Sequence, residues 1–167
     1  MSRKQFLVIV LLLLVNACFG QRVQKNAVYV ELGGNGTLYS VNYEREFKTQ
    51  WVGRIGISYY DNYLNIPVMF GQYFGEGKHH FEVTAGITCI FDNSNDGVYY
   101  YHGSFQESGS RTRILLTAFA GYRFQKQDKN FLFKAGFTPF YSPHDSRDKI
   151  NTGWFLPWVG VSFGYRF

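Results

Sequence analysis

The fold is decided by the stretch Trp158-Val-Gly-Val-Ser-Phe-Gly-Tyr-Arg-Phe167, in which apolar residues alternate with small or polar ones. Successive side chains of a β-strand point to opposite faces of the sheet, so this stretch predicts a strand with one apolar face. The apolar face is made of Val159, Val161, Phe163, Tyr165 and Phe167. A strand of this kind needs partner strands, and the same alternation recurs along the rest of the chain.

The first twenty residues have the pattern of an export signal. A short basic segment precedes a ten-residue apolar run at 6–15, and small or neutral residues follow up to residue 20. That run is too short for a transmembrane helix, which needs about 20 apolar residues. We expect residues 1–20 to be a signal peptide cleaved before Gln21, leaving 21–167 as one domain. The alternative is lipidation at Cys18, because Val15-Asn-Ala-Cys18 partly resembles a lipobox.

The composition favours many strands. Charged residues are 17% of the chain and aromatic residues 20%, with 18 glycines, whereas soluble domains carry roughly 25% charged residues. Beyond the export signal, no apolar run approaches the roughly 18 residues of a membrane-spanning helix. The net charge of +5 falls by two to +3 when Arg3 and Lys4 are removed with the signal. This charge is too mild to indicate a nucleic-acid partner.

Alternation bounded by turn residues predicts an all-β fold, an eight-stranded antiparallel up-and-down transmembrane β-barrel. The expected strands are 27–33, 38–47, 51–60, 64–74, 80–91, 112–124, 131–141 and 155–167.

The connections between these strands alternate in length. Long connections at 92–111 and 142–153 fall at one end, with the turns at 33–36 and 61–63, and the short connections at 48–50, 75–78 and 125–130 fall at the other. This pattern is typical of outer-membrane barrels, whose external loops are long and whose periplasmic turns are short. Three prolines inside the expected strands would lie toward the extracellular ends, where the hydrogen-bond ladder lapses. They are Pro67, Pro139 and Pro157.

A secreted, lipocalin-like barrel is the alternative fold. It would show the same alternation, with its apolar face turned inward around a ligand. We favour the membrane barrel because the polar face is rich in glycine, whereas a solvated face would carry Lys, Glu and Thr. Aromatic residues near strand ends, such as Trp51 and Tyr59, also fit the two interfacial girdles of a membrane barrel.

Three stretches carry a family resemblance: Leu64-Asn-Ile-Pro-Val-Met-Phe-Gly-Gln-Tyr-Phe-Gly75, Gly121-Tyr-Arg-Phe124 and the terminal aromatic strand. They resemble the small eight-stranded outer-membrane β-barrel proteins of the OmpA transmembrane-domain and OmpX type and the outer membrane protein beta-barrel domain family. The resemblance implies residence in the cell outer membrane, contact with its lipid and lipopolysaccharide, and insertion by the barrel assembly machinery. It also implies that Phe163, Tyr165 and Phe167 form a C-terminal assembly signal. It does not select a function, because such barrels host adhesion, structural, transport and enzymatic roles.

Charged residues on the inward face predict an ion-pair network that fills the lumen. Its expected members are Glu31, Glu44, Glu82, Arg54, Arg113, Arg123 and Lys134, and Glu46 and Arg166 also face inward. An eight-stranded barrel is just wide enough for side chains to fill it, and buried charges must pair. The alternative is a gated polar path through the lumen.

The third external loop offers an interaction surface made of Tyr99, Tyr100, Tyr101 and Phe105. Tyrosine suits recognition loops because it presents a rigid amphipathic area. Extension of the two flanking strands above the membrane would explain the same residues.

Two patterns in that loop suggest other chemistry. Asp92-Asn-Ser-Asn-Asp-Gly97 matches the first half of a calcium loop, but Gly103 stands where the bidentate Glu belongs, and the same residues favour simple turns. His102-Gly-Ser104 is reminiscent of the His-x-Ser of outer-membrane lipid A deacylases, without the rest of that motif. We therefore predict no catalytic residue, no metal site and no cofactor. Cys89 is expected to be a small apolar strand residue rather than a reactive thiol.

The sequence thus predicts a non-enzymatic, monomeric outer-membrane barrel with a filled lumen that acts as a structural or surface-interaction protein through its external loops. The alternatives are a narrow conduit for small or hydrophobic solutes and an outer-membrane lipid-modifying enzyme. The extracellular ligand or partner is not specified by any motif.

Overall fold

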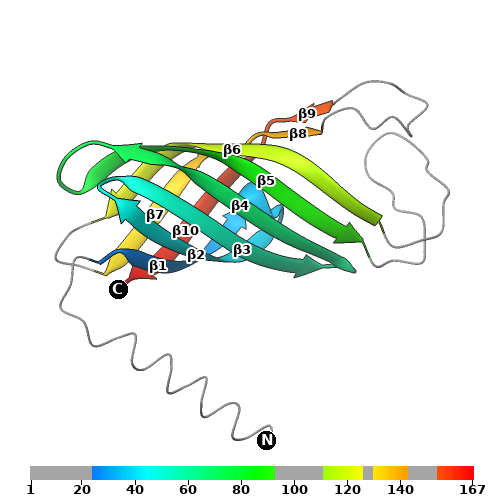
Figure 1. Ribbon diagram of the computed structural model, residues 1–167, viewed down its shortest axis with the longest axis horizontal. Helices are drawn as coiled ribbons and strands as arrows, with labels where there is room; N and C mark the ends of the chain where they lie inside the picture. Colours follow the sequence, from blue (N-terminus) through cyan, green and yellow to red (C-terminus); the bar gives the residue numbers. More distant parts are fainter. Residues whose placement is uncertain (1–23, 93–110, 126–129, 143–153) are drawn as a thin grey trace, which may run out of the picture.

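The computed structural model describes residues 24–92, 111–125, 130–142 and 154–167 (Figure 1). The expected export signal and the expected loop features at 93–105 lie outside these ranges. Within them, no helix is long and apolar enough to cross a membrane.

Ten strands and one short 3-10 helix make up the described chain. They are β1 (Asn26–Gly33), η1 (Gly34–Gly36), β2 (Tyr39–Lys48), β3 (Trp51–Tyr60), β4 (Tyr63–Phe74), β5 (His79–Asp92), β6 (Arg111–Gln125), β7 (Phe131–Phe137), β8 (Phe140–Ser142), β9 (Trp154–Leu156) and β10 (Val159–Arg166).

The ten strands close into an eight-stranded antiparallel barrel, and we call each of the eight strand positions around it a wall. Each of β1 to β7 pairs with its neighbour in the chain, β7 pairs with β10, and β10 pairs with β1 to close the circuit. The short strands β8 and β9 extend the seventh and eighth walls, β8 pairing with both β6 and β9. The predicted fold, a closed eight-stranded antiparallel barrel, is confirmed.

The two ends of the barrel differ. The short turns β2–β3 and β4–β5 lie at the same end as the described chain ends near residues 24 and 167, and we call this the short-turn end (Figure 1). β5, β6, β8 and β9 lead to the opposite end, which we call the long-loop end. The described strand ends that flank the connections expected to be external therefore lie at one end of the barrel.

Proline interrupts the seventh and eighth walls. The stretch expected as one strand at 131–141 is split at Thr138-Pro139, and that at 155–167 is split at Pro157-Trp158. Pro67 behaves differently, because it is the fifth residue of β4 and the β4–β5 ladder runs through it. Only the β3–β4 ladder lapses beside it, since proline lacks one backbone N–H and each N–H serves a single neighbouring strand. The ladder therefore lapses inside β4 as well as at the long-loop end.

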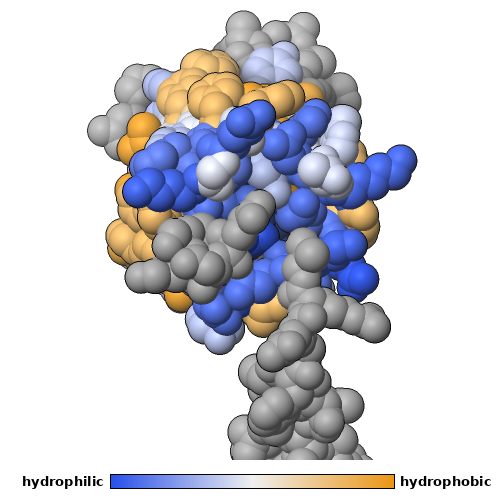
Figure 2. Space-filling model, turned by 90° about the vertical axis from the view of Figure 1, so that its left-hand side faces the viewer, coloured by the Kyte–Doolittle hydropathy of each residue, from blue (hydrophilic) through white to orange (hydrophobic). Residues whose placement is uncertain are grey.

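The barrel is apolar outside and polar inside. Val30 is 47% exposed and Phe163 50%. By contrast, Glu31, which follows Val30 in β1, and Lys134 of β7 are fully buried. Seen from the short-turn end, hydrophilic residues occupy the end of the barrel and hydrophobic residues surround its flanks (Figure 2). The lipocalin-like alternative, which needs an inward apolar face, is excluded by this arrangement.

Candidate functional site

Four charged side chains from four strands meet in the lumen. Glu44 of β2 and Glu82 of β5 each contact both Arg123 of β6 and Lys134 of β7. Arg123 Nη1 lies 2.6 Å from Glu44 Oε1 and 2.8 Å from Glu82 Oε2. Lys134 Nζ lies 3.1 Å from Glu44 Oε2 and 2.6 Å from Glu82 Oε1. The period-two alternation places all four on the inner face, and closure of the sheet brings them together.

A second ion pair joins this quartet through a tyrosine. Arg54 Nη1 lies 3.2 Å from Glu31 Oε1 and donates to the Tyr29 hydroxyl at 3.2 Å. Lys134 Nζ donates to the same hydroxyl at 3.3 Å, and that hydroxyl is 3.4 Å from Glu44 Oε2. We call these seven residues the lumen cluster: Tyr29, Glu31, Glu44, Arg54, Glu82, Arg123 and Lys134.

The lumen cluster is balanced in charge, with three carboxylates against three cations, and all of them are buried. Burying an unpaired charge is costly, so the pairing makes burial tolerable rather than adding a large net stability. The cations also lie over aromatic rings, with Arg123 4.6 Å from the Tyr73 centroid and Lys134 5.1 Å from that of Phe119. The lumen at this level is therefore filled by paired charges and rings.

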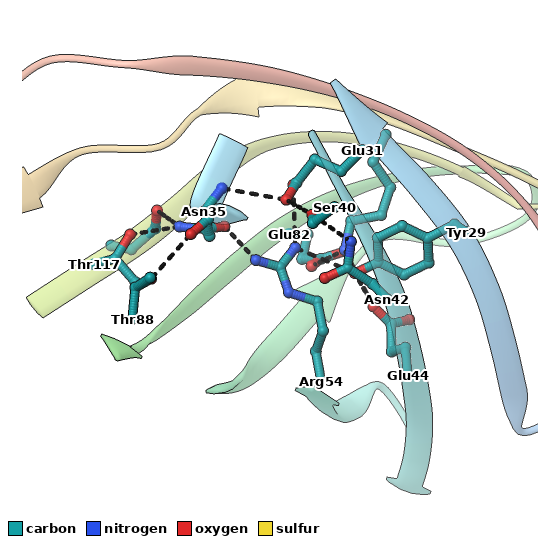
Figure 3. A network of polar contacts seen from close by, with 12 residues as sticks. Tyr29, Glu31, Asn35, Ser40, Asn42, Glu44, Arg54, Glu82, Thr88 and Thr117 are labelled. Carbon is teal, nitrogen blue, oxygen red and sulfur yellow. Dashed lines mark hydrogen bonds and ion pairs between the residues drawn. The ribbon is translucent and has the colours of Figure 1, made fainter. Parts of the chain in front are cut away.

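The turn after β1 folds into the barrel and fills the lumen at a second level (Figure 3). Its residue Asn35 is fully buried and donates from Nδ2 to Thr117 Oγ1 at 2.5 Å and to the Ala118 carbonyl at 3.0 Å. Asn35 also accepts from Arg54 through its side-chain oxygen and from Thr88 Oγ1 through its carbonyl, the latter at 2.9 Å. We call η1, which includes Asn35, the plug, because it contacts β3, β5 and β6 from the inside of the barrel.

Glycine makes this inward turn possible. Gly33 and Gly34 have φ of +68° and +73°, in the left-handed region that favours glycine. A Cβ on Gly34 would lie 2.2 Å from Glu31 Cδ, so a larger residue would have to displace that carboxylate from its ion pair. The Asn35 backbone N–H then donates to Glu31 Oε2 at 3.2 Å, which ties the plug to the lumen cluster.

The structure brings six of the seven expected network residues together. The exception is Arg113, which is exposed near the long-loop end of β6, opposite Ile90 of β5, and makes none of the ion pairs of the lumen cluster. The assignment of Arg113 to the network was wrong because alternation gives the face of a residue and not its height, and β6 runs past the plug at this point. Arg166 lies at the short-turn end, with Nη2 3.6 Å from Glu46 Oε2.

The residues expected to form the assembly signal lie on the closing strand. Phe163 and Tyr165 point outward and are 50% and 54% exposed. Phe167 exchanges two backbone hydrogen bonds with Asn26 at 2.8 and 3.0 Å, which completes the seam between β10 and β1. This geometry gives the terminal residue a structural role at the point of closure.

The remaining expected features divide between described and undescribed residues. Tyr99, Tyr100, Tyr101, Phe105 and the histidine of the His-x-Ser pattern lie outside the described ranges. Cys89 is half-buried with a free thiol. Among the described residues, no group of three or more His, Cys, Asp or Glu is placed to hold a metal ion.

Sequence reasoning missed the plug and the bridging tyrosine. Gly33-Gly34-Asn35-Gly36 was interpreted as an external turn, and its three glycines are the signal that could have indicated a close backbone approach. From the sequence, Tyr29 is assigned to no site, although it lies on the same face of β1 as Glu31.

Comparison with known proteins supports the fold. No protein-family model matches the chain, and the curated proteins likewise yield no match. Among solved structures, the N-terminal β-barrel domain of Pseudomonas aeruginosa OprF is similar, with a TM-score of 0.59 and 14% sequence identity. The match covers 86% of this chain and 96% of that one. The expected resemblance to the small eight-stranded barrels is therefore confirmed at the level of the fold: this chain folds as a closed eight-stranded barrel similar to the OprF domain.

Proposed function

We propose that the protein is an integral outer-membrane β-barrel with a closed lumen, serving as a structural scaffold that presents its long loops to the cell exterior. The observation that carries the proposal is the inverted distribution of polarity, with an apolar outer surface around a buried ionic cluster. In water, exposure of so many large apolar side chains would be unfavourable. Its cost is about 25 cal/mol for each Å² of apolar surface that lipid would otherwise remove from water.

Closure of the sheet supports insertion into lipid. A bilayer core offers no hydrogen-bond partners to the backbone, so a sheet can cross it only when no strand edge is left open. Here the pairing of β1 with β10 supplies that closure. Aromatic contacts near the short-turn end, such as Trp51 stacked on Phe70 at 5.4 Å, are typical of an interfacial girdle.

The lumen favours a scaffold over a conduit. A solute would have to pass both the plug and the lumen cluster, and each is held by several hydrogen bonds or ion pairs across the barrel. Opening the quartet would leave charges unpaired in a low dielectric, which costs several kcal/mol. We therefore assign the function to the outer surface and the loops rather than to the lumen.

Outer-membrane location rests on the export signal and the terminal aromatic strand together with this geometry. In that location the apolar flanks contact membrane lipid, the barrel assembly machinery inserts the chain, and lipopolysaccharide surrounds the long-loop end. No residue of the described chain forms a constellation that favours the lipid-enzyme alternative.

Fractionation and electrophoresis test the proposal. The protein should co-sediment with the outer membrane, resist carbonate extraction, and change gel mobility when it is boiled, because a closed barrel keeps its compact form in detergent until heated. Recovery as a soluble periplasmic protein would overturn the proposal. In planar bilayers the folded protein should give no stable channel, and large, lasting conductance steps would instead establish the conduit.

A further inference from the structure

Few charges lie on the outer surface of the described strands. Arg45 of β2 faces outward between Tyr43 and Phe47, and Lys48 at the end of that strand is opposite the outward-facing Trp51. The cross-strand partners of Arg45 are Asn26, the first residue of β1, and Gly53 near the start of β3. Arg45 therefore lies close to the short-turn end, at the level where aromatic residues gather, and not in the middle of the apolar surface.

A second cation lies near Arg45. Lys48 is exposed and ends the same strand, opposite Trp51. Lys25 is excluded, because it is opposite Glu46, on the other face of the sheet from Arg45. We call Arg45 and Lys48 the basic patch.

The basic patch is not neutralised by the acids around it. Glu46 turns toward the interior, where it pairs with Arg166. Glu76, in the β4–β5 turn, is exposed and makes no ion pair with the patch in the described part of the chain. Two neighbouring cations repel one another, and an anion placed between them relieves that repulsion.

Aromatic side chains border the patch. The Tyr43 hydroxyl donates to Asn26 Oδ1 at 2.8 Å, and Phe47 packs against Phe70, which stacks on Trp51. Such rings prefer the boundary between acyl chains and headgroups. A guanidinium at that depth can hydrogen-bond a phosphate in a bidentate manner.

We propose that the basic patch binds the headgroup of an anionic phospholipid in the membrane leaflet at the short-turn end. Arg45 contacts the phosphate, Lys48 contributes attraction from the water side, and the neighbouring aromatic residues contact the acyl chains. This inference rests on the proposed function, because it needs the barrel to be in a bilayer.

Quenching of Trp51 fluorescence by brominated lipid tests the inference. Trp51 is the cross-strand partner of Lys48, and replacing Trp154 and Trp158 by Phe leaves it as the single reporter. The folded protein is placed in phosphatidylcholine vesicles that contain equal mole fractions of acyl-brominated phosphatidylglycerol or acyl-brominated phosphatidylcholine. We expect the anionic lipid to quench roughly twofold more strongly, with the excess decreasing at high salt.

Variants separate the patch from general charge effects. The double variant Arg45→Gln, Lys48→Gln should quench equally with both lipids, and Arg45→Gln alone should lose most of the excess. Arg113→Gln, at the opposite end, removes one exposed cation and should keep the full excess. Gel mobility before and after boiling checks that each variant is folded.

The outcomes distinguish the two proposals. Quenching by neither brominated lipid would mean that the barrel is not in the bilayer, which would overturn the proposed function and this inference with it. Equal quenching by both lipids in the unsubstituted reporter would leave the membrane barrel standing and overturn the lipid site alone. An excess that survives in the double variant would also overturn the lipid site.

Discussion

Asn35, in the turn after β1, donates from Nδ2 to Thr117 Oγ1 of β6 at 2.5 Å, so residues 82 positions apart in the chain meet inside the barrel. Through its side-chain oxygen the same residue accepts a hydrogen bond from Arg54, which pairs with Glu31. The plug and the lumen cluster are therefore one connected polar network. A substitution in either part should weaken the hydrogen bonds and ion pairs of the other.

Asn35→Ala should destabilise the folded barrel by about 1–3 kcal/mol, because it leaves buried groups on Arg54 and Thr117 with fewer partners. Urea unfolding in detergent micelles measures the change. Thr49→Ala, in the exposed β2–β3 turn, is the control and should change the free energy of unfolding by no more than about 0.5 kcal/mol. Equal effects of the two variants would contradict the plug.

Glu82→Gln should cost about 3–5 kcal/mol, because it leaves Arg123 and Lys134 buried with Glu44 as their remaining carboxylate in the quartet. Adding Lys134→Gln restores the balance of charge, so the double variant should be more stable than the sum of the single variants implies. A double-mutant cycle by equilibrium unfolding provides the coupling. Strict additivity would show that the pair does not interact.

Gly34→Ala should destabilise the barrel far more than Gly77→Ala. Both glycines have a left-handed φ, of +73° and +75°, so alanine is strained at either position. At Gly34 the new methyl group would also meet Glu31, whereas nothing lies within 4 Å of it at Gly77. The difference in unfolding free energy therefore isolates the cost of the packed plug, and similar values would indicate backbone strain alone.

Val30→Lys should cost about 2–4 kcal/mol in lipid vesicles, whereas Asn26→Lys on the same face of β1 should cost no more than about 1 kcal/mol. Val30 pairs with Val41 and Phe163 on the apolar surface, and Asn26 begins the strand at the short-turn end. Unfolding in vesicles measures both. A position-independent cost would argue against a membrane around these strands.

Deletion of Phe167 should reduce the amount of folded, heat-modifiable protein in the cell envelope several-fold. The deletion removes both backbone hydrogen bonds to Asn26 at the seam that closes the barrel. Phe131→Ala removes an exposed aromatic side chain at the same end and leaves the seam intact, so it should assemble nearly as well as the natural chain. Equal loss in both variants would indicate a general need for aromatic residues there.

The strands and their faces could be predicted from the sequence because both depend on short-range order. An alternation of period two, as in Val28, Val30 and Leu32 against Tyr29 and Glu31, assigns each side chain to a face without any knowledge of its partners. The same alternation gives all seven network residues an inward phase, and six of them meet in the structure. It could not detect that Arg113 lies beyond the filled part of the lumen, because height depends on the stagger between strands.

The sequence by itself therefore determined the number of walls, their direction and the separation of an apolar outer face from a polar inner one, since these follow from local periodicity and turn residues. Only the tertiary structure decided which charges pair, that Asn35 enters the lumen, and that β7 and β10 are continued by separate strands beyond proline. These features depend on the register between strands distant in the chain and on the narrow bore that closure creates. The strand from Val159 to Arg166 shows both: its alternation predicted a strand, and its pairing with β1 makes that strand the seam of a barrel.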